Sequence, residues 1–464
     1  MRVIAALVAI TMLGLLAGLL VWQGARGGAV EPMVERPHVV LISLDTVRAD
    51  HLGCYGYARP TSPNIDRFAE HSVRYERSIA TAPWTLPSHA SMFTGLYPHE
   101  HGARSFKVSD RHRNNARPLP RSHTRLAEVL QGLGYRTAAF VANNVYLTKR
   151  WNLHQGFDEY LVERQRAPGV NRATLRWLAS RDEQPFFLFV NYMDAHRPYN
   201  TASGPSQVDW DVPRDRSLLN QLIDAAMAGD GEADPALRDA VVAQYDNGIA
   251  HVDRAVGQLL SALDEAGHGD RALIVVTSDH GEYFGEHRLV EHSKDVYEAA
   301  VHVPLLIREP GRRRGRSDET PVTSAHLPRM ILERIPAAHR ELAHFPRRAG
   351  DEPILSENYF TRTKDLLHPV WGHRFEDVRT AIYDMPLKLI HSTRDAPELY
   401  DIERDPRERD DLAPGRPGKV EELVHRVPDA LRREDAGDEP DDAEAAPELT
   451  PQERRNLRAL GYME

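Results

Sequence analysis

The chain has 464 residues, of which 41% are hydrophobic and 27% are charged. This composition is typical of a soluble globular enzyme and excludes disordered, collagen-like and polytopic membrane proteins, while the length favours a large domain with a small one. The net charge of -10 argues against a nucleic-acid-binding protein, because such proteins present a basic surface to the phosphate backbone. The single cysteine, Cys54, excludes an intramolecular disulfide and a thiolate metal site.

The N-terminal segment is predicted to be an export signal or a membrane anchor. Residues 3–22 are apolar and uncharged over about the length that spans the hydrocarbon core of a bilayer. Small residues follow between positions 24 and 29, but they contain no clean Ala-x-Ala cleavage site, so cleavage and retention both stay open. In either case we expect the catalytic part in the periplasm or another extracytoplasmic space.

Four short apolar runs predict strands that are buried on both faces of a sheet. They are residues 39–44, 137–142, 186–190 and 272–276, and they are followed by Asp45, Asn143, Asp194 with His196, and Asp279 with His280. Helical periodicity lies between them, at 125–133 after Ser122 as the expected N-cap, and at 235–266. This alternation predicts a mostly parallel sheet with helices on both faces, and ligands bind at the carboxyl ends of such strands.

Two regions depart from this alternation. Residues 199–234 are polar and lack periodicity, which predicts a long surface loop near His196 and a candidate for substrate selection. From about residue 353, short strand-like pieces predict a small antiparallel α+β subdomain, and the acidic residues 434–446 predict disorder before a short helix at 450–460. We therefore expect a signal peptide or anchor (1–29), a catalytic domain (36–345), a C-terminal subdomain (350–412) and a charged, partly disordered tail with a short terminal helix (413–464).

Asp45 and the Asp279–His280 pair predict a metal site. A lone aspartate at a strand end is more often a cap or a turn residue, but two carboxylates with an adjacent imidazole suit a divalent cation. Thr85 lies two residues before Pro87, which suits the first turn of a helix. Thr85 either caps this helix, or it is a nucleophile whose hydroxyl pKa a metal lowers and whose negative charge the helix N-terminus favours. Ser88 would then take part of the capping.

Histidines are concentrated in the same regions of the sequence. A single histidine is more often a packed or a surface residue, whereas several on strand-end loops can bind an oxyanion, protonate a leaving group or complete a second metal site. They are His89, His99, His101, His196, His287 and His292.

These motifs resemble the sulfatase family of the alkaline-phosphatase superfamily over roughly residues 37–412. Residues 41–56, LISLDTVRADHLGCYG, are similar to the family's first metal-binding segment, and residues 278–287, SDHGEYFGEH, are similar to its second. Residues 398–406, ELYDIERDP, resemble the end of the family's C-terminal subdomain. The resemblance implies an alkaline-phosphatase-like α/β fold, with a mostly parallel sheet sandwiched by helices and a small C-terminal antiparallel α+β subdomain.

The resemblance also implies roles for individual residues. Asp45, Asp279 and His280 would hold one metal ion, with Thr85 as the fourth protein ligand and the nucleophile. Asn143, His196 and His292 would contact the oxyanion, and His101 is a further candidate for substrate binding. The expected catalytic residues are thus Thr85, His89, His196 and His292. Calcium is the favoured metal, because it is common in the family, while an imidazole among oxygens also suits manganese or zinc.

Two positions depart from the family's pattern. The family's nucleophile motif is Cys or Ser, any residue, Pro, any residue, Arg, whereas here Thr85 takes the first position and His89 the last. Threonine cannot be oxidised to formylglycine, so the formylglycine-hydrate mechanism is not expected. Thr46 follows Asp45 where many relatives have a second aspartate, which removes one potential carboxylate ligand.

The expected activity is metal-dependent hydrolysis of a sulfate ester, or of a related phosphate or phosphonate diester, with Thr85 as nucleophile. The expected partner is a sulfated or phosphorylated small molecule or glycan, and no nucleic acid. One alternative is a membrane-surface phosphotransferase or phosphodiesterase that acts on lipid or glycan headgroups, which the N-terminal segment permits. Another is an inactive pseudoenzyme that binds glycans through the same residues.

Overall fold

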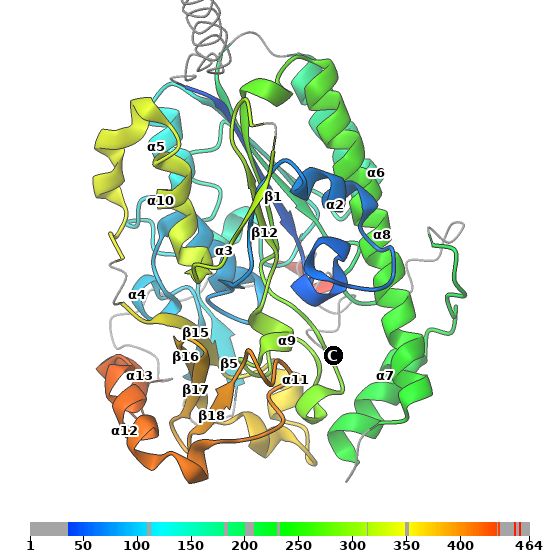
Figure 1. Ribbon diagram of the computed structural model, residues 1–464, viewed down its shortest axis with the longest axis vertical. Coiled ribbons are helices and arrows are strands. Elements are labelled where there is room, and N and C mark those ends of the chain that lie inside the picture. Colours follow the sequence, from blue (N-terminus) through cyan, green and yellow to red (C-terminus); the bar gives the residue numbers. More distant parts are fainter. Residues whose placement is uncertain are drawn as a thin grey trace, which may run out of the picture. The chain divides into compact units, whose positions relative to one another are not determined.

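An eight-stranded sheet forms the centre of the described chain (Figure 1). The computed structural model describes residues 36–108, 113–180, 184–199, 208–229, 233–312, 314–348, 352–433, 435–436, 450–451 and 454–455. In spatial order the strands are β13 (Arg316–Asp318), β2 (Val73–Tyr75), β12 (Leu305–Arg308), β9 (Ala272–Thr277), β1 (His38–Leu44), β8 (Phe186–Tyr192), β6 (Arg136–Val141) and β7 (Glu159–Val162). β12 runs antiparallel to its neighbours β9 and β2, and the other pairs in this sheet are parallel.

The central strands are apolar throughout because both faces of the sheet are covered. In β1, Val40 and Ile42 pack into one hydrophobic core, whereas Val39 and Leu41 pack into the other. The first core is covered by α2 (Pro63–Ala69), α6 (Ala167–Ala179) and α8 (Pro235–Glu265), and the second by α3 (Thr85–Thr94), α5 (Leu126–Gly132) and α10 (Leu327–Leu332) (Figure 1). The predicted parallel sheet between two helical layers is therefore confirmed.

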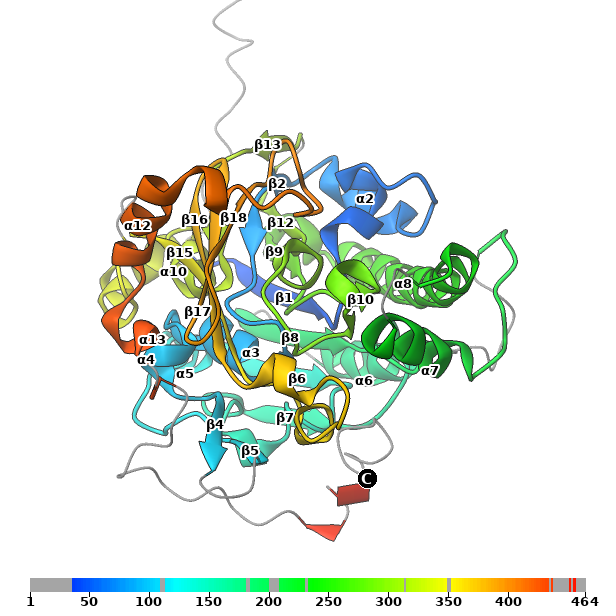
Figure 2. The ribbon, with the colours of Figure 1, turned by 90° about the horizontal axis from the view of Figure 1, so that it is seen from below.

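A second, four-stranded antiparallel sheet forms the C-terminal subdomain. Its strands are β15 (Ile354–Tyr359), β16 (Val378–Asp384), β17 (Leu387–Ser392) and β18 (Glu398–Asp401). One face packs on the core that includes α6 and α8, through Ala381 and Ile390. The other face packs against α12 (Pro417–Arg426) and α13 (Asp429–Arg432), which lie along the sheet (Figure 2).

Short elements complete the described chain. The two-stranded sheets are β4 (Ser105–Val108) with β5 (Arg113–Ala116), β3 (Ser78–Ile79) with β14 (Val322–Thr323), and β10 (Tyr283–Phe284) with β11 (Val290–Glu291). The short helices are α4 (Pro98–His101), α7 (Leu218–Ile223), α9 (Glu298–Val301) and α11 (Thr363–Leu366).

The structure differs from three of the sequence predictions. The helix expected after Ser122 begins at Leu126, with Arg125 as its N-cap and Glu128 closing the capping box. The described part of the expected loop 199–234 contains α7 and a π-helical turn, Asp224–Ala228. Leu222 of α7 and Met227 of the turn are buried. Residues assigned to the tail form α12 and α13, because Leu423 and Leu431 are buried against the C-terminal sheet.

The remaining predictions concern residues outside the described part. The apolar stretch 3–22 is one of these, and so are nearly all of 434–446 and most of 450–460. Among the residues that the structure describes, none of the helices is long and apolar enough to cross a membrane.

Candidate active site

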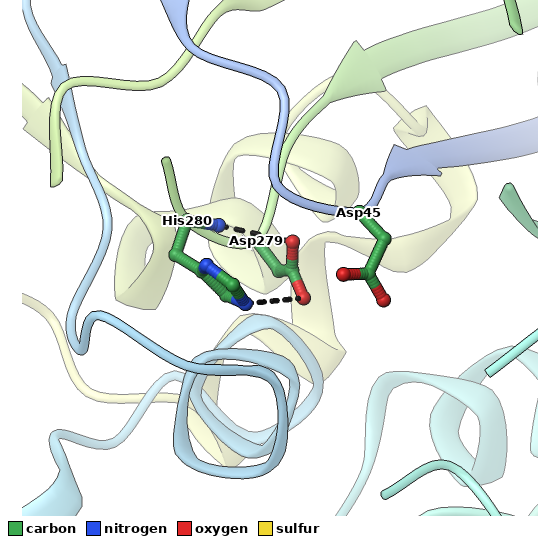
Figure 3. A group of neighbouring side chains, drawn as sticks. All are labelled: Asp45, Asp279 and His280. Atoms are coloured by element: carbon green, nitrogen blue, oxygen red, sulfur yellow. Dashed lines mark hydrogen bonds and ion pairs between the residues drawn. The ribbon is translucent and has the colours of Figure 1, made fainter. Parts of the chain in front are cut away.

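The ends of the central strands bring the predicted metal ligands together. Asp45 follows β1, and Asp279 and His280 follow β9, whose pairing with β1 aligns Ser43 with Thr277. As a result, one ligand atom from each of Asp45, Asp279 and His280 lies within 4.8 Å of the others, and all three residues are buried (Figure 3). Parallel strands produce this arrangement because their carboxyl ends meet at one edge of the sheet.

Two buried carboxylate oxygens in this group fit a divalent cation. Oδ1 of Asp45 and Oδ2 of Asp279 are buried and have no hydrogen-bond partner in the described structure. Burial and the neighbouring Asp279 raise the pKa of Asp45 well above its usual range, and burial raises the pKa of Asp279 to about 7. Two adjacent carboxylates that lose their hydration without a counter-charge are a costly arrangement, which a metal ion resolves.

Thr46 contacts both aspartates of this group. Its backbone N–H donates to Oδ1 of Asp279 at 3.2 Å, and its own hydroxyl donates to the Asp45 carbonyl at 2.7 Å. The backbone of Thr46 has a φ of 64°, a conformation that a β-branched residue rarely adopts and that is concentrated at functional sites. The backbone at this position thus orients Asp279, while the side chain is directed back to its own carbonyl.

Three histidines are held through the same ring nitrogen. Nδ1 of His280 hydrogen bonds to the Gly281 carbonyl at 2.9 Å, and Nδ1 of His196 to the Arg197 carbonyl at 2.7 Å. A carbonyl accepts only, so Nδ1 carries the proton in both rings, and Nε2 is the acceptor atom of the neutral ring. Burial lowers the pKa of His280, which keeps its ring neutral and able to bind a metal.

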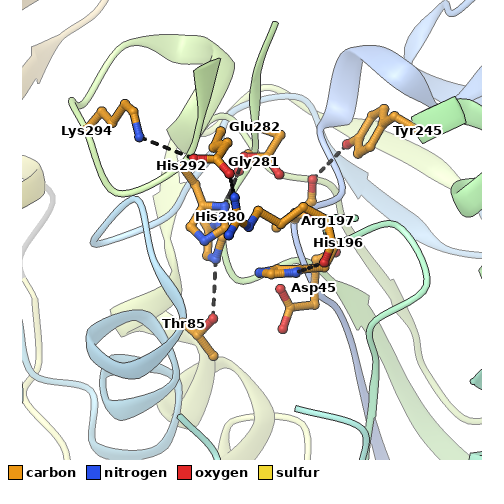
Figure 4. Close-up of polar contacts among 12 residues, drawn as sticks. Asp45, Thr85, His196, Arg197, Tyr245, His280, Gly281, Glu282, His292 and Lys294 are labelled. Atoms are coloured by element: carbon orange, nitrogen blue, oxygen red, sulfur yellow. Dashed lines mark hydrogen bonds and ion pairs between the residues drawn. The ribbon is translucent and has the colours of Figure 1, made fainter. Parts of the chain in front are cut away.

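His292 extends this group of imidazoles. Its Nδ1 lies 2.9 Å from Oε1 of the buried Glu282, and its ring centroid lies 4.6 Å from that of His280 and 5.0 Å from that of His196 (Figure 4). The carboxylate of Glu282 fixes the orientation of the ring, as it does for many metal-site histidines. The sequence prediction gave Glu282 no role, although it lies two residues after His280 in the quoted motif.

Thr85 is the first residue of α3 and not its cap. Its Oγ1 lies 3.5 Å from Nε2 of His280 (Figure 4). It also lies 3.4 Å from Nδ2 of Asn143, which donates to Oδ2 of Asp45 at 2.8 Å. Trp84 precedes the helix without a side-chain cap, and the hydroxyl of Ser88 donates to the Asp279 carbonyl at 2.6 Å. The expected capping role of Ser88 is therefore wrong. The Thr85 hydroxyl lies at the positive end of the helix. It is directed to Asp45, Asp279 and His280, which are called the metal-site group below.

His89 and His101 lie deeper than the other predicted histidines. Nδ1 of His89 donates to the Thr85 carbonyl at 2.9 Å, within α3, and lies 3.5 Å from Oδ2 of Asp279, so this ring links the first turn of the helix to Asp279. In His101, Nε2 contacts the Pro87 carbonyl at 3.2 Å and Nδ1 accepts from the N–H of Ala103 at 3.0 Å. Because both nitrogens of His101 are engaged inside the protein, its contacts do not support the expected substrate binding.

Several cations near His292 were not predicted. Lys294, Arg197 and Arg362 are buried, and Arg362 comes from the C-terminal subdomain. The backbone N–H of Ser293 donates to the Pro83 carbonyl at 2.9 Å, which places this segment beside the residues that lead into Thr85. Lys294 and Arg197 are close in sequence to His292 and His196, which is a signal that sequence reasoning could have used; Arg362 has no such signal.

The family comparison agrees with this geometry. The Sulfatase family model matches residues 37–336. This match covers more than half of the 464 residues, and the chain belongs to the sulfatase family of hydrolases, within the alkaline-phosphatase superfamily.

Similar proteins include both sulfatases and a phosphonate hydrolase. An arylsulfatase of Clostridium perfringens is 24% identical, with 86% of this chain and 93% of the relative covered. A multifunctional alkaline phosphatase superfamily protein of Trinickia caryophylli is 26% identical, with 82% and 91% covered. Among solved structures, the phosphonate monoester hydrolase of Agrobacterium radiobacter has a TM-score of 0.61 at 22% identity and covers 84% of this chain and 95% of its own. At this identity the likeness shows a shared fold.

Proposed function

We propose that this chain is a divalent-metal-dependent hydrolase of sulfate esters, or of related phosphate and phosphonate diesters, with Thr85 as the nucleophile. The observation that carries the proposal is the position of Thr85 Oγ1, 3.5 Å from Nε2 of His280 and at the N-terminus of α3. This oxygen lies beside two buried carboxylates that have partnerless oxygens. A hydroxyl at such a place is suited to nucleophilic catalysis.

Asp45, Asp279 and His280 would hold the metal, together with the oxygen of Thr85. A bound divalent cation would lower the pKa of the Thr85 hydroxyl and offset negative charge on the transferred group. Carboxylate and hydroxyl oxygens favour calcium, while the single imidazole also suits manganese or zinc.

The protein's own groups would position the reacting ester. The Asn143 amide lies 3.4 Å from Thr85 Oγ1, and its carbonyl oxygen accepts from the backbone N–H of Val145 and Tyr146, so its orientation is fixed. His196 and His292 are oriented through Nδ1, and we assign their rings to the oxyanion or the leaving oxygen. The Thr85 oxygen would attack sulfur or phosphorus, the bond to the leaving oxygen would break, and water would release the resulting threonine ester.

The substrate class belongs to the same proposal. We propose a sulfated or phosphorylated small molecule or glycan outside the cytoplasm, since the apolar stretch 3–22 predicts export.

The proposal is tested by measuring turnover of 4-nitrophenyl sulfate, phosphate, a phosphate diester and a phosphonate after chelation and re-addition of calcium, manganese or zinc. We expect metal-dependent release from the sulfate or from the diester and phosphonate, and a loss of at least about a thousandfold in Thr85→Ala. Thr94→Ala, which removes a buried hydroxyl bonded to the Ala90 carbonyl on the same helix, is the matched control. Undiminished turnover in Thr85→Ala would reject the nucleophile, and absence of turnover on all four esters would favour the glycan-binding alternative.

The role of His292 is tested separately by varying the leaving group. If His292 assists the leaving oxygen, His292→Ala loses more activity on esters of phenol than on esters of 4-nitrophenol, because the better leaving group needs less help. Equal losses on both would limit His292 to binding the oxyanion.

A further inference from the structure

The ring of His89 joins three segments that carry the proposed active site. Its Nδ1 hydrogen bonds to the Thr85 carbonyl at 2.9 Å, and its Nε2 lies 2.9 Å from Oγ of Ser43. Oδ2 of Asp279 lies 3.5 Å from the same Nδ1. Ser43 belongs to β1, Thr85 begins α3 and Asp279 follows β9. One side chain therefore contacts the strand, the helix and the loop that meet at the metal-site group.

The partners of this ring determine which nitrogen carries the proton. A carbonyl oxygen only accepts, so Nδ1 of His89 donates to Thr85. Nε2 of the neutral ring is then an acceptor, and the Ser43 hydroxyl, which can donate or accept, donates to it. The ring is fully buried and makes edge contacts with the rings of Phe93 and Phe189. A charged imidazole is unfavourable in such apolar surroundings, which agrees with a neutral ring.

Ser43 is a fixed reference point for the ring. Its register partners in the sheet are Asn191 of β8 and Thr277 of β9, so its backbone is held on both sides. Its side chain is buried and reaches α3 through the contact with His89. Asp45 follows two residues later, at the end of the same strand. The hydrogen bond between Ser43 and His89 therefore ties the first turn of α3 to the strand that carries a candidate metal ligand.

We propose that Ser43 and His89 are positioning residues that hold the Thr85 oxygen at the metal-site group. Both ring nitrogens of His89 have partners inside the protein and the ring is buried, so its contacts favour positioning over contact with the substrate. A nucleophile displaced by about 1 Å can lose about a hundredfold in rate, so two weak hydrogen bonds can have a large catalytic effect. This inference rests on the proposed function, because it concerns the proposed nucleophile.

The first test measures turnover of the 4-nitrophenyl ester that the wild type prefers. We expect His89→Leu to lower kcat about a hundredfold with little change in KM, equally on esters of phenol and of 4-nitrophenol. His89→Asn keeps a side-chain N–H in place of Nδ1–H and should restore kcat to within about tenfold of the wild type. A larger loss on esters of phenol, or no rescue in His89→Asn, would overturn the positioning role.

Ser43→Ala is a milder change that keeps the test valid if the His89 variants fold poorly. We expect its kcat to fall about fivefold, as for one lost hydrogen bond, with no further fall when it is combined with His89→Asn, whose side chain is too short to reach Ser43. Ser91→Ala is the matched control and should keep the wild-type kcat, since Ser91 Oγ lies 3.2 Å from Nε2 of the buried His101 on the other side of the same helix turn sequence. Additive losses in the double variant, or an equal loss in Ser91→Ala, would contradict the inference.

NMR of protein labelled with nitrogen isotope in the histidine rings tests the contact without turnover. The two tautomers give different nitrogen shifts, and His89→Asn identifies the signal of His89. We expect the proton on Nδ1 in the wild type, and a proton on Nε2 would overturn the inference even in an active enzyme. The expected tautomer in a protein without turnover would reject the proposed hydrolysis and retain the link between Ser43, His89 and Thr85.

Discussion

The metal-site group and the junction with the C-terminal subdomain treat buried carboxylates in opposite ways. At the metal site, Asp45 and Asp279 have amide and imidazole neighbours, and burial raises the pKa of both. At the junction, burial also opposes ionisation of Asp365, but the charges of Arg362 and Lys294 outweigh it and lower its pKa. At the junction Lys294 and Arg362 pair with Asp365, whereas among the described residues no lysine or arginine pairs with Asp45 or Asp279. The comparison is the reason for proposing a cation at the strand ends and not at the junction.

A second buried ion group at the same junction gives the largest expected effect. Nζ of Lys388 lies 2.9 Å from Glu298 and 2.7 Å from Glu408, and all three residues are buried. Lys388→Met leaves two carboxylates without their cation, so we expect the free energy of unfolding to fall by about 3–5 kcal/mol. Urea unfolding measures this change.

Lys419→Met is the matched control, because Lys419 also pairs with two carboxylates but does so at the surface, where such pairs contribute less than about 1 kcal/mol. If both variants lost equally little stability, the junction would not be the charge-compensated region described above.

Removing a charge at the metal site should not lower the free energy of unfolding, in contrast to Lys388→Met. Without metal, Asp45→Asn should be at least as stable as the wild type, because burial and Asp279 both disfavour the charged form of Asp45. With metal at about a hundredfold above its Kd, the wild type should gain about 2.7 kcal/mol and the variant nothing.

Thermal unfolding with and without calcium, manganese and zinc measures both effects. Asp239→Asn on the exposed surface of α8 is the control and should keep the metal response. A metal-induced stabilisation that persists in Asp45→Asn would contradict the assignment of this ligand.

The smallest expected effect is a pH dependence of stability that comes from a contact between α4 and β15 of the C-terminal subdomain. Nδ1 of His99 lies 2.6 Å from Oε1 of the buried Glu357. Burial opposes the imidazolium, but the charge of Glu357 outweighs it and raises the pKa of His99. A raised pKa in the folded state means that the stabilisation is complete below the unfolded value, about 6.5. It is lost as the pH rises through the folded value.

The free energy of unfolding of the wild type, relative to that of His99→Gln, should therefore decline as the pH is raised from about 6.5. His344→Gln, which removes an exposed contact between His344 and Glu341, serves as the control. A pH dependence in His99→Gln that matches the wild type would show that this ion pair does not contribute.

The main strands and the candidate metal ligands could be predicted from short stretches of sequence. β1, β6, β8 and β9 are continuous apolar runs, which is a local property, and the rule for the carboxyl ends of parallel strands then places Asp45, Asp279 and His280 together. α7 was missed because it has only 6 residues, too few to show helical periodicity within the surrounding polar stretch, although its Leu222 is buried. α12 was assigned to the tail because its apolar face is recognisable only against the C-terminal sheet.

The sequence by itself determined the fold class, the main strands and the residues that meet at their ends as a candidate metal site, because these depend on periodicity and on motifs within a few residues. Only the tertiary structure decided which nitrogen of His280 faces the site, that His101 is fully engaged, and that Arg362 meets Glu291 from 71 positions away. The physical reason is that protonation, burial and ion pairing depend on neighbours in space. No residue type carries information about a partner that the chain brings to it only by folding.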